Sequence, residues 1–372
     1  KNVSLTLTAD DGVDDADSNA EIVVGTTTAA TGTVNVQHTG DYLASGNNIL
    51  SGITVTGGTT ITVNQDTGIS AADIAAARTD TGNFAVTQGT VTATGSAATT
   101  TISVTQDKEF TKVEGDAGAA NDGQIGVTNG AVTIADASAA LTTTAGTLAT
   151  VNLTNFGNTT IDSSALTSVN LAGDGGTLGI SRGALTATPT ANILALGLTG
   201  ATTSTITDAE ATSDEGFTTI NLTGNTTAST ISSFVAADMT TLTAAGDAKI
   251  TLTAHTLASL TGVTVTNTGG LSMSGTALGN AVTFAGGTGA DAIQVGATTQ
   301  DLTMGAGNDT VIYTAVAGTS GTVAGGGGTD TVSMTFALAN AADASGAFNT
   351  SHTSFEALTI SDALSGALDV DA

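Results

Sequence analysis

Apolar and polar residues alternate along much of the chain with the two-residue period of half-buried β-strands. Clear examples are Ile53–Thr56, Val91–Thr94 and Ile102–Val104. The segment 52–65 resembles the segment 89–106, because each reads as a strand, a glycine turn and a second strand. This repetition predicts a β-sandwich-like domain with a repeated hairpin over residues 21–140.

A single helix is expected inside this domain, over residues 70–78. Ser70 is placed as its N-cap, and Asp73 follows three residues later in a capping-box arrangement.

From about residue 145 the pattern changes to a longer period. A similar apolar motif begins at Leu148, Leu166, Phe217, Met239 and Leu257, so that several copies are separated by about 20 residues. A repeat of this length is typical of a solenoid, whose units bury their apolar faces only on one another. We therefore predict one continuous parallel β-solenoid over residues 145–335, followed by an apolar capping segment over 336–372.

Three glycine-rich blocks with a sixth-position aspartate lie at the end of this solenoid. Residues 286–294 and 325–333 fit the nonapeptide G-G-x-G-x-D-x-U-x at every fixed position, whereas 304–312 has Met304 in place of the first glycine. Calcium prefers six to eight hard oxygen ligands. Glycine-rich turns can supply several of these as backbone carbonyls, because glycine adopts positive φ angles without steric cost. The predicted calcium ligands are Gly286, Thr288, Asp291, Gly305, Gly307, Asp309, Gly325, Gly327 and Asp330.

The spacing of the aspartates predicts how the turns are arranged. Asp291 and Asp309 are 18 residues apart, which is two nonapeptides, and Asp309 and Asp330 are 21 apart. If two nonapeptides form one coil, the three turns stack on one edge, with calcium between successive turns. The opposite edge, at 295–301, has lost the motif, and we expect it to be weakly metallated or bare.

A second group of acidic residues lies in the segment 1–20, which is either a calcium loop at a domain junction or a solvated linker. The segment matches no EF-hand spacing, so both interpretations stay open. A further acidic loop at 114–122 either binds calcium or simply turns. The candidate ligands in the first loop are Asp10, Asp11, Asp14, Asp15 and Asp17.

The charge balance supports a cation-dependent protein. The chain of 372 residues has 33 acidic and 6 basic residues, a net charge of −27 and a mean hydropathy of +0.24. Unfilled cation ligands explain this combination better than disorder, which goes with low hydropathy. Nucleic acid is excluded as a partner, because phosphate binding needs Lys and Arg. No apolar run is long enough for a membrane span, and the absence of cysteine leaves calcium as the expected staple of a secreted protein.

No catalytic constellation is recognisable, so we expect a protein that is not an enzyme. His38, His255 and His352 are far apart in the sequence, and none stands beside a candidate nucleophile. Polyuronate lyases and epimerases share the β-solenoid architecture. After Arg182, however, this chain has Lys249 as its single basic residue, which is too little positive charge for a polyanion groove.

The composition, the solenoid and the three nonapeptides together resemble the RTX-type bacterial S-layer proteins. This resemblance implies type I secretion, calcium-driven folding outside the cell, and self-assembly into a two-dimensional lattice on the cell surface. It also implies contact with lipopolysaccharide through a region outside this sequence. The chain starts inside a strand-like run and is expected to be a fragment of a longer protein. The alternative interpretation is an RTX adhesin that uses the same fold to bind another surface.

Overall fold

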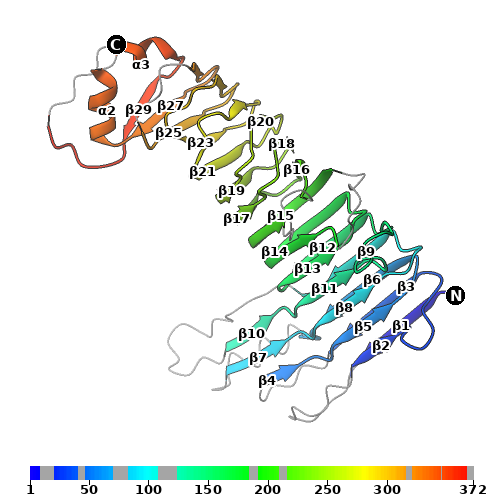
Figure 1. Ribbon diagram of the computed structural model, residues 1–372. Coiled ribbons are helices and arrows are strands. Elements are labelled where there is room, and N and C mark those ends of the chain that lie inside the picture. Colours follow the sequence, from blue (N-terminus) through cyan, green and yellow to red (C-terminus); the bar gives the residue numbers. More distant parts are fainter. Residues whose placement is uncertain are drawn as a thin grey trace. The chain divides into compact units, whose positions relative to one another are not determined.

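The computed structural model shows an almost entirely β-structured chain, which confirms the predicted all-β class. The chain divides into two compact units, Lys1–Ala191 and Asn192–Ala372. In both units the strands of successive coils lie side by side and pair in parallel (Figure 1). The structure describes residues 1–8, 21–40, 47–69, 83–107, 124–183, 192–208, 216–315, 321–344 and 346–366.

The first unit winds its coils through two main faces of parallel sheet. The long strand β14 belongs to both faces, because it pairs first with β12 and then with β13. One face contains β1 (Val3–Thr8), β3 (Val34–Thr39), β6 (Thr60–Asp66), β9 (Thr101–Thr105), β12 (Thr150–Phe156) and β14 (Ser168–Ser181). The other contains β2 (Ile22–Val24), β5 (Ile53–Thr56), β8 (Val91–Thr94), β11 (Val132–Ala135), β13 (Thr159–Asp162) and the end of β14.

A short third sheet completes the first unit, formed by β4 (Asn47–Ile49), β7 (Asn83–Thr87) and β10 (Gln124–Thr128).

Buried glutamine side chains lie near the ends of β6, β7 and β9. Gln106 Nε2 donates to Gln65 Oε1 at 2.7 Å, and Gln88 Nε2 donates to the Gln65 carbonyl at 3.2 Å. Because buried polar groups must be paired, these bonds help to fix the register of adjacent coils.

The core of the first unit consists of apolar columns that run from coil to coil. One column contains Val34, Ile61, Ile102, Val151 and Val169, which oppose one another in the parallel register. All five are at most 1% exposed. The alternation that predicts strands therefore places every second side chain in a thin β-branched and aliphatic core.

The sandwich-like interpretation of residues 21–140 is wrong. β5 and β6 were predicted to form a hairpin, but β5 pairs with β8 and β6 pairs with β9, all in parallel. The solenoid also continues across the boundary expected at 140–145, because β9 pairs with β12 and β11 with β13. The helix predicted at 70–78 lies outside the described residues.

The second unit continues the same architecture with two faces. β15 (Ile193–Asp208) belongs to both. One face adds β16 (Thr219–Gly224), β18 (Thr241–Gly246), β20 (Gly262–Val265), β22 (Thr283–Ala285), β24 (Leu302–Thr303), β26 (Val323–Ala324) and β28 (His352–Thr353). The other adds β17 (Ser229–Val235), β19 (Ile250–Thr256), β21 (Leu271–Leu278), β23 (Ala292–Val295), β25 (Thr310–Tyr313), β27 (Thr331–Met334) and β29 (Ala357–Ile360).

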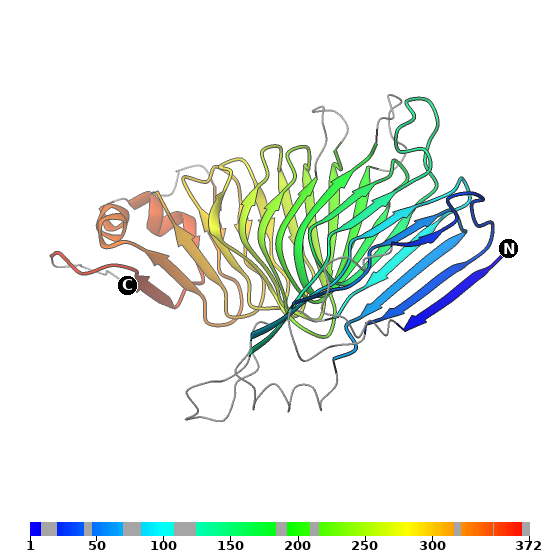
Figure 2. The ribbon, with the colours of Figure 1, turned by 90° about the horizontal axis from the view of Figure 1, so that it is seen from below.

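Two helices, α2 (Phe336–Asp343) and α3 (Gly346–Ser351), precede the last rung and lie beside the final strands (Figure 2). Thr335 caps α2 by accepting a hydrogen bond from the Leu338 amide. The segment predicted as a cap contains these helices and one more rung of the solenoid, formed by β28 and β29. Phe348 stacks on His352 with ring centroids 3.7 Å apart. Leu358, in contrast, lies in β29 opposite Val332 of β27 and remains 41% exposed. None of the helices among the described residues is long and apolar enough to span a membrane.

Candidate metal centre

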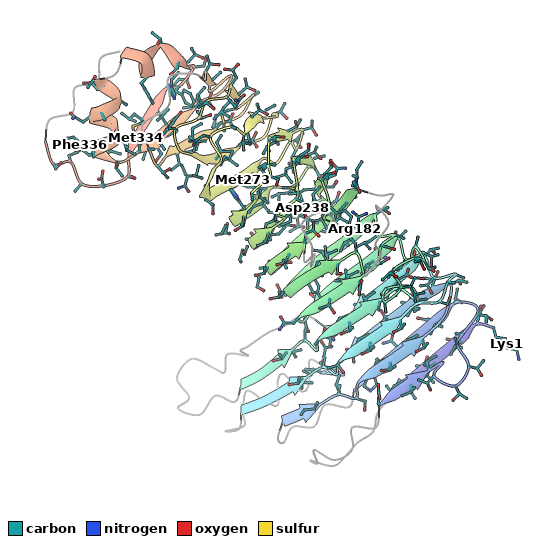
Figure 3. All side chains as sticks on the ribbon, in the orientation of Figure 1. Lys1, Arg182, Asp238, Met273, Met334 and Phe336 are labelled. Atoms are coloured by element: carbon teal, nitrogen blue, oxygen red, sulfur yellow. The ribbon has the colours of Figure 1, made fainter. Side chains whose placement is uncertain are left out.

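The three glycine–aspartate turns occupy equivalent places in successive coils of the second unit. Each turn joins a short strand of one face to a short strand of the other, and the register places Ala292 opposite Thr310 and Thr310 opposite Thr331. The aspartate before each of these residues therefore stacks on the next one, which confirms the predicted arrangement on one edge. Figure 3 labels Met273, which lies in β21 one coil before this stack, and Met334, which lies in β27 directly after the last of the three turns.

The backbone bonds of the aspartates form a regular ladder, which we call the carboxylate column (Asp291, Asp309, Asp330). The amide of Asp291 donates to Asp309 Oδ1 at 2.7 Å, and the amide of Asp309 donates to Asp330 Oδ1 at 2.9 Å. One coil earlier, the amide of Leu271 donates to Asp291 Oδ1 at 2.7 Å. One oxygen of every carboxylate is thus used to hold the preceding coil in place.

The unusual feature of the column is the second carboxylate oxygen, Oδ2, of each aspartate. The three aspartates are 1%, 1% and 0% exposed, and Asp309 Oδ2 and Asp330 Oδ2 have no hydrogen-bond partner among the described residues. Asp291 Oδ2 accepts one long bond, 3.2 Å, from the Gly287 amide. Burying an ionised oxygen without a partner is costly, so these atoms fit a bound cation.

The residues around these oxygens also suit calcium. A β-carbon built on Gly286 would lie 1.7 Å from the Met304 carbonyl oxygen and 2.9 Å from Asp291 Oδ2. Glycine therefore keeps open a small space bounded by a carbonyl of the next coil and a carboxylate. The described residues contain no group of three or more His, Asp or Glu side chains suited to a metal. Backbone carbonyls would have to provide most ligands, as calcium allows.

The register refines the list of predicted ligands. Gly286 and Gly325 hold the first position of their turns and Thr288 and Gly327 the third, but Gly305 and Gly307 hold the second and fourth. The predicted glycines are thus not equivalent to one another. Left-handed backbone occurs at the second and fourth positions of the second and third turns, where Gly305 and Gly307 have φ of 98° and 134°, and Gly326 and Gly328 have φ of 103° and 139°. Gly287 and Gly289, at the same positions of the first turn, are not left-handed. The structure shows the turns, and calcium binding to them stays a prediction.

The preceding coil shows how a turn is held without a cation. Asn267 is completely buried, and its amide group donates to the carbonyls of Ala245 and Ala248 while its oxygen accepts from the amides of Gly269 and Gly270. The Asn267 side chain thus satisfies its turn through both donor and acceptor groups. An ionised aspartate has only acceptors, so its unpartnered oxygen is left for a proton or a cation.

The coils that contain the three motifs, residues 286–333, form a segment that we call the roll. The edge of the roll opposite the carboxylate column has a different chemistry. Thr298 is 3% exposed and bonds within its own turn to Gln300. Asp301 is exposed and accepts from both the amide and the hydroxyl of Thr322 at 2.9 and 2.7 Å. These bonds lower the pKa of Asp301. One oxygen of this carboxylate, Oδ1, is held by protein donors, and the weakly metallated or bare edge stays a prediction.

The other acidic turns give no further support for metal binding. The loop that contains Asp10, Asp11, Asp14, Asp15 and Asp17 lies outside the described residues, as does the loop at 114–122. At Gly246 the backbone is left-handed, with φ of 102°, and Asp247 Oδ1 accepts from the Thr226 amide at 2.8 Å, as in an ordinary hydrogen-bonded turn. The sequence reasoning also missed Glu356, whose Oε2 accepts from the Asp330 amide at 2.8 Å.

The histidines lie in separate places. His38 is 2% exposed and His255 is 8% exposed, both in strands. His352 packs against Phe348 and Tyr313, and its Nδ1 lies 2.9 Å from the Phe348 carbonyl oxygen.

Comparison with known proteins does not identify a family for this chain. Neither the family models nor the curated proteins compared with this sequence give a match.

Burial is the main electrostatic effect on Asp291 and Asp309. Burial raises the pKa of Asp309 to about 6; the bond from the Asp291 amide opposes this rise, and the neighbouring Asp291 and Asp330 carboxylates add to it. Burial also raises the pKa of Asp291, against the lowering effect of the amides of Leu271 and Gly287 and the charge of Lys249. In the absence of a cation, Asp291 and Asp309 therefore ionise less readily than an exposed aspartate.

A pH dependence of the calcium-free protein follows from this shift. An unfolded aspartate titrates near 3.9, so between about pH 4 and 6 the folded chain binds a proton at Asp309 that the unfolded chain lacks. Folding stability in EDTA should therefore rise as the pH falls from 7 to 5. Thermal unfolding of the wild type and of Asp309→Asn measures this, and the variant should show the smaller rise. An equal rise in both would assign the effect to the general charge of −27 instead.

Proposed function

We propose that this chain is a calcium-dependent structural protein of a bacterial surface layer. The observation that carries the proposal is the buried carboxylate column with its unpartnered oxygens at Asp309 and Asp330. Buried charges without protein partners need a ligand of opposite charge, and hard carboxylate and carbonyl oxygens favour calcium. The glycine-rich turns, the parallel solenoid and the absence of cysteine fit the RTX-type S-layer resemblance.

The role of the bound calcium in this proposal is to neutralise charge and to join coils. With 33 acidic and 6 basic residues, the calcium-free chain repels itself, which opposes compaction. A cation between adjacent turns stabilises the folded state by mass action, because the unfolded chain does not assemble the site. Low calcium inside the cell and high calcium outside would then keep the chain unfolded for type I secretion and fold it at the cell surface.

The solenoid suits a structural role because its faces are regular and are bonded from coil to coil. Outward columns of polar residues bond from coil to coil, as where Asn170 Nδ2 donates to Asn152 Oδ1 at 2.8 Å. Threonine hydroxyls do the same further along: Thr240 and Thr261 donate to the carbonyls of the preceding coils at 3.1 and 3.0 Å. Such faces provide a stiff unit for a lattice in which calcium bridges acidic surfaces of neighbouring copies. An anchor to lipopolysaccharide would lie outside this sequence.

Assembly is the experiment that tests this proposal. Adding millimolar calcium to the purified chain should convert soluble monomers into sheet-like assemblies, and a chelator should reverse the change. Light scattering and negative-stain electron microscopy measure the result. Magnesium is the control, and it should substitute poorly because it demands a small, near-octahedral shell. Equal assembly in magnesium alone would contradict the proposal.

An RTX adhesin is the second candidate, because it would use the same calcium-stabilised solenoid. It predicts folding in calcium without lattice formation, so a calcium-loaded chain that stays monomeric at high concentration would favour the adhesin over the surface layer. We retain the expectation that the chain is not an enzyme, because the proposal assigns the buried carboxylates to calcium and requires no catalytic group.

A further inference from the structure

The carboxylate column continues for one coil beyond the three motifs. The amide of Asp330 donates to Glu356 Oε2 at 2.8 Å, as the amide of Asp309 donates to Asp330 Oδ1. In return, the amides of Glu356 and Ala357 donate to the Asp330 carbonyl at 3.1 and 3.0 Å. Glu356 therefore takes the place that an aspartate holds in the other turns, although the sequence around it does not fit the nonapeptide.

The turn that carries Glu356 is shorter than the others and has no glycine. It contains Ser354, Phe355 and Glu356 between β28 and β29, whereas the turn before it spans 325–330. Ser354 adopts a left-handed backbone with φ of 58°, a conformation that is uncommon for residues other than glycine. The longer side chain of glutamate lets this short turn reach the column.

The Ser354 carbonyl occupies the place that the Met304 carbonyl holds in the first motif. A β-carbon built on Gly325 would lie 1.9 Å from the Ser354 carbonyl oxygen and 2.8 Å from Asp330 Oδ2. The corresponding values for Gly286 are 1.7 Å to the Met304 carbonyl oxygen and 2.9 Å to Asp291 Oδ2. The short last turn thus reproduces the small oxygen-bounded space of the motif turns.

An unpaired oxygen points to a ligand in this space. Asp330 is 0% exposed, and its Oδ2 has no hydrogen-bond partner among the described residues. Asp330 Oδ1 is already used by the Asp309 amide, so Oδ2 is the atom left for a cation on the side of the Ser354 turn. Asp330 belongs to the last nonapeptide, whereas the Ser354 turn that it faces lies beyond the motif.

We propose that Asp330, Glu356 and the Ser354 carbonyl form an additional calcium site that closes the roll. The site rests on the proposed calcium function and extends it beyond the nonapeptides. Both carboxylates supply hard, negatively charged ligands, and the carbonyl supplies a neutral one. Because Glu356 is exposed, water completes the coordination shell, and this ion binds more weakly than the ions between the buried aspartates.

Counting calcium ions tests the site. Native mass spectrometry of the 372-residue chain in saturating calcium should show one ion fewer for Glu356→Gln than for the wild type. The matched control is Glu21→Gln, the same change at an exposed glutamate that directly precedes β2 in the first unit, and it should lose none. An unchanged count in Glu356→Gln would overturn this site alone. A wild-type chain that binds no calcium would overturn the calcium function as a whole.

Carboxyl footprinting of the wild type provides a test that does not depend on the folding of a variant. Carbodiimide labelling of Glu356 should fall at least about tenfold when calcium is added, since a bound cation occupies the carboxylate. Labelling of Glu21 should stay the same, and magnesium should protect neither residue. Equal labelling of Glu356 with and without calcium would overturn the site.

Discussion

Asp309→Asn should make the protein less stable than the wild type in calcium but at least as stable in EDTA. Asp309 is the middle member of the column, so both inter-turn sites depend on its charge. We expect calcium affinity to fall on the order of 100-fold, which equals roughly 2.8 kcal/mol. In EDTA the same change removes a buried unpaired charge, while the amide oxygen can still accept from the Asp291 amide.

This reversal between the two conditions separates a metal ligand from a purely structural aspartate. Chemical denaturation followed by circular dichroism gives the free energy of unfolding in each condition. Asp301→Asn is the control, because Asp301 is exposed at the opposite edge and already bonded to Thr322. Its unfolding should keep the calcium dependence of the wild type. An Asp309→Asn protein that calcium stabilises as strongly as the wild type would show that the column binds no calcium.

Gly328→Ala should be strongly destabilising, whereas Gly327→Ala should be tolerated. Gly328 has φ of 139°, and a β-carbon there would lie 1.7 Å from the Gly307 carbonyl oxygen. A methyl group would have to push adjacent turns apart, so we expect a loss of about 3 kcal/mol or more of unfolding free energy. A β-carbon on Gly327 would meet nothing within 4 Å, so its substitution should change stability by about 0.5 kcal/mol at most.

The comparison of Gly328→Ala with Gly327→Ala tests the stacking of the turns directly. Both variants remove one glycine from the same motif, so a general effect of glycine content on the unfolded chain is the same in each. Denaturant midpoints measured in saturating calcium give the comparison. Similar stabilities of the two variants would mean that the turns do not stack as closely as the register between Ala306 and Gly327 indicates.

The roll could be predicted from sequence because its coils have a nearly constant length. Asp291 and Asp309, which bond across one coil, are separated by 18 residues, and the motif marks both. The first unit has the same architecture, but its coils are lengthened by insertions. Gln65 and Gln106, which also bond across one coil, are 41 residues apart. No short period survives before β12, and two-residue alternation alone does not distinguish parallel from antiparallel strands.

The site was predictable only as far as the motif extends. Glycine and aspartate in fixed spacing reveal the turns, because few other residues allow the left-handed positions. Ser354 and Glu356 follow neither rule, since a three-residue turn and a longer acid replace the six-residue turn and its aspartate. Their place in the column depends on the pairing of β27 with β29, which sequence spacing does not show.

Long-wavelength anomalous diffraction from crystals grown in calcium tests the central claim most directly. The account predicts anomalous peaks between the turns of Asp291 and Asp309 and between those of Asp309 and Asp330, each within calcium–oxygen distance, about 2.3–2.6 Å, of at least one of the two aspartate carboxylates that flank it. Soaking in magnesium should remove the peaks. Well-ordered turns without anomalous density in calcium-replete crystals would contradict the account.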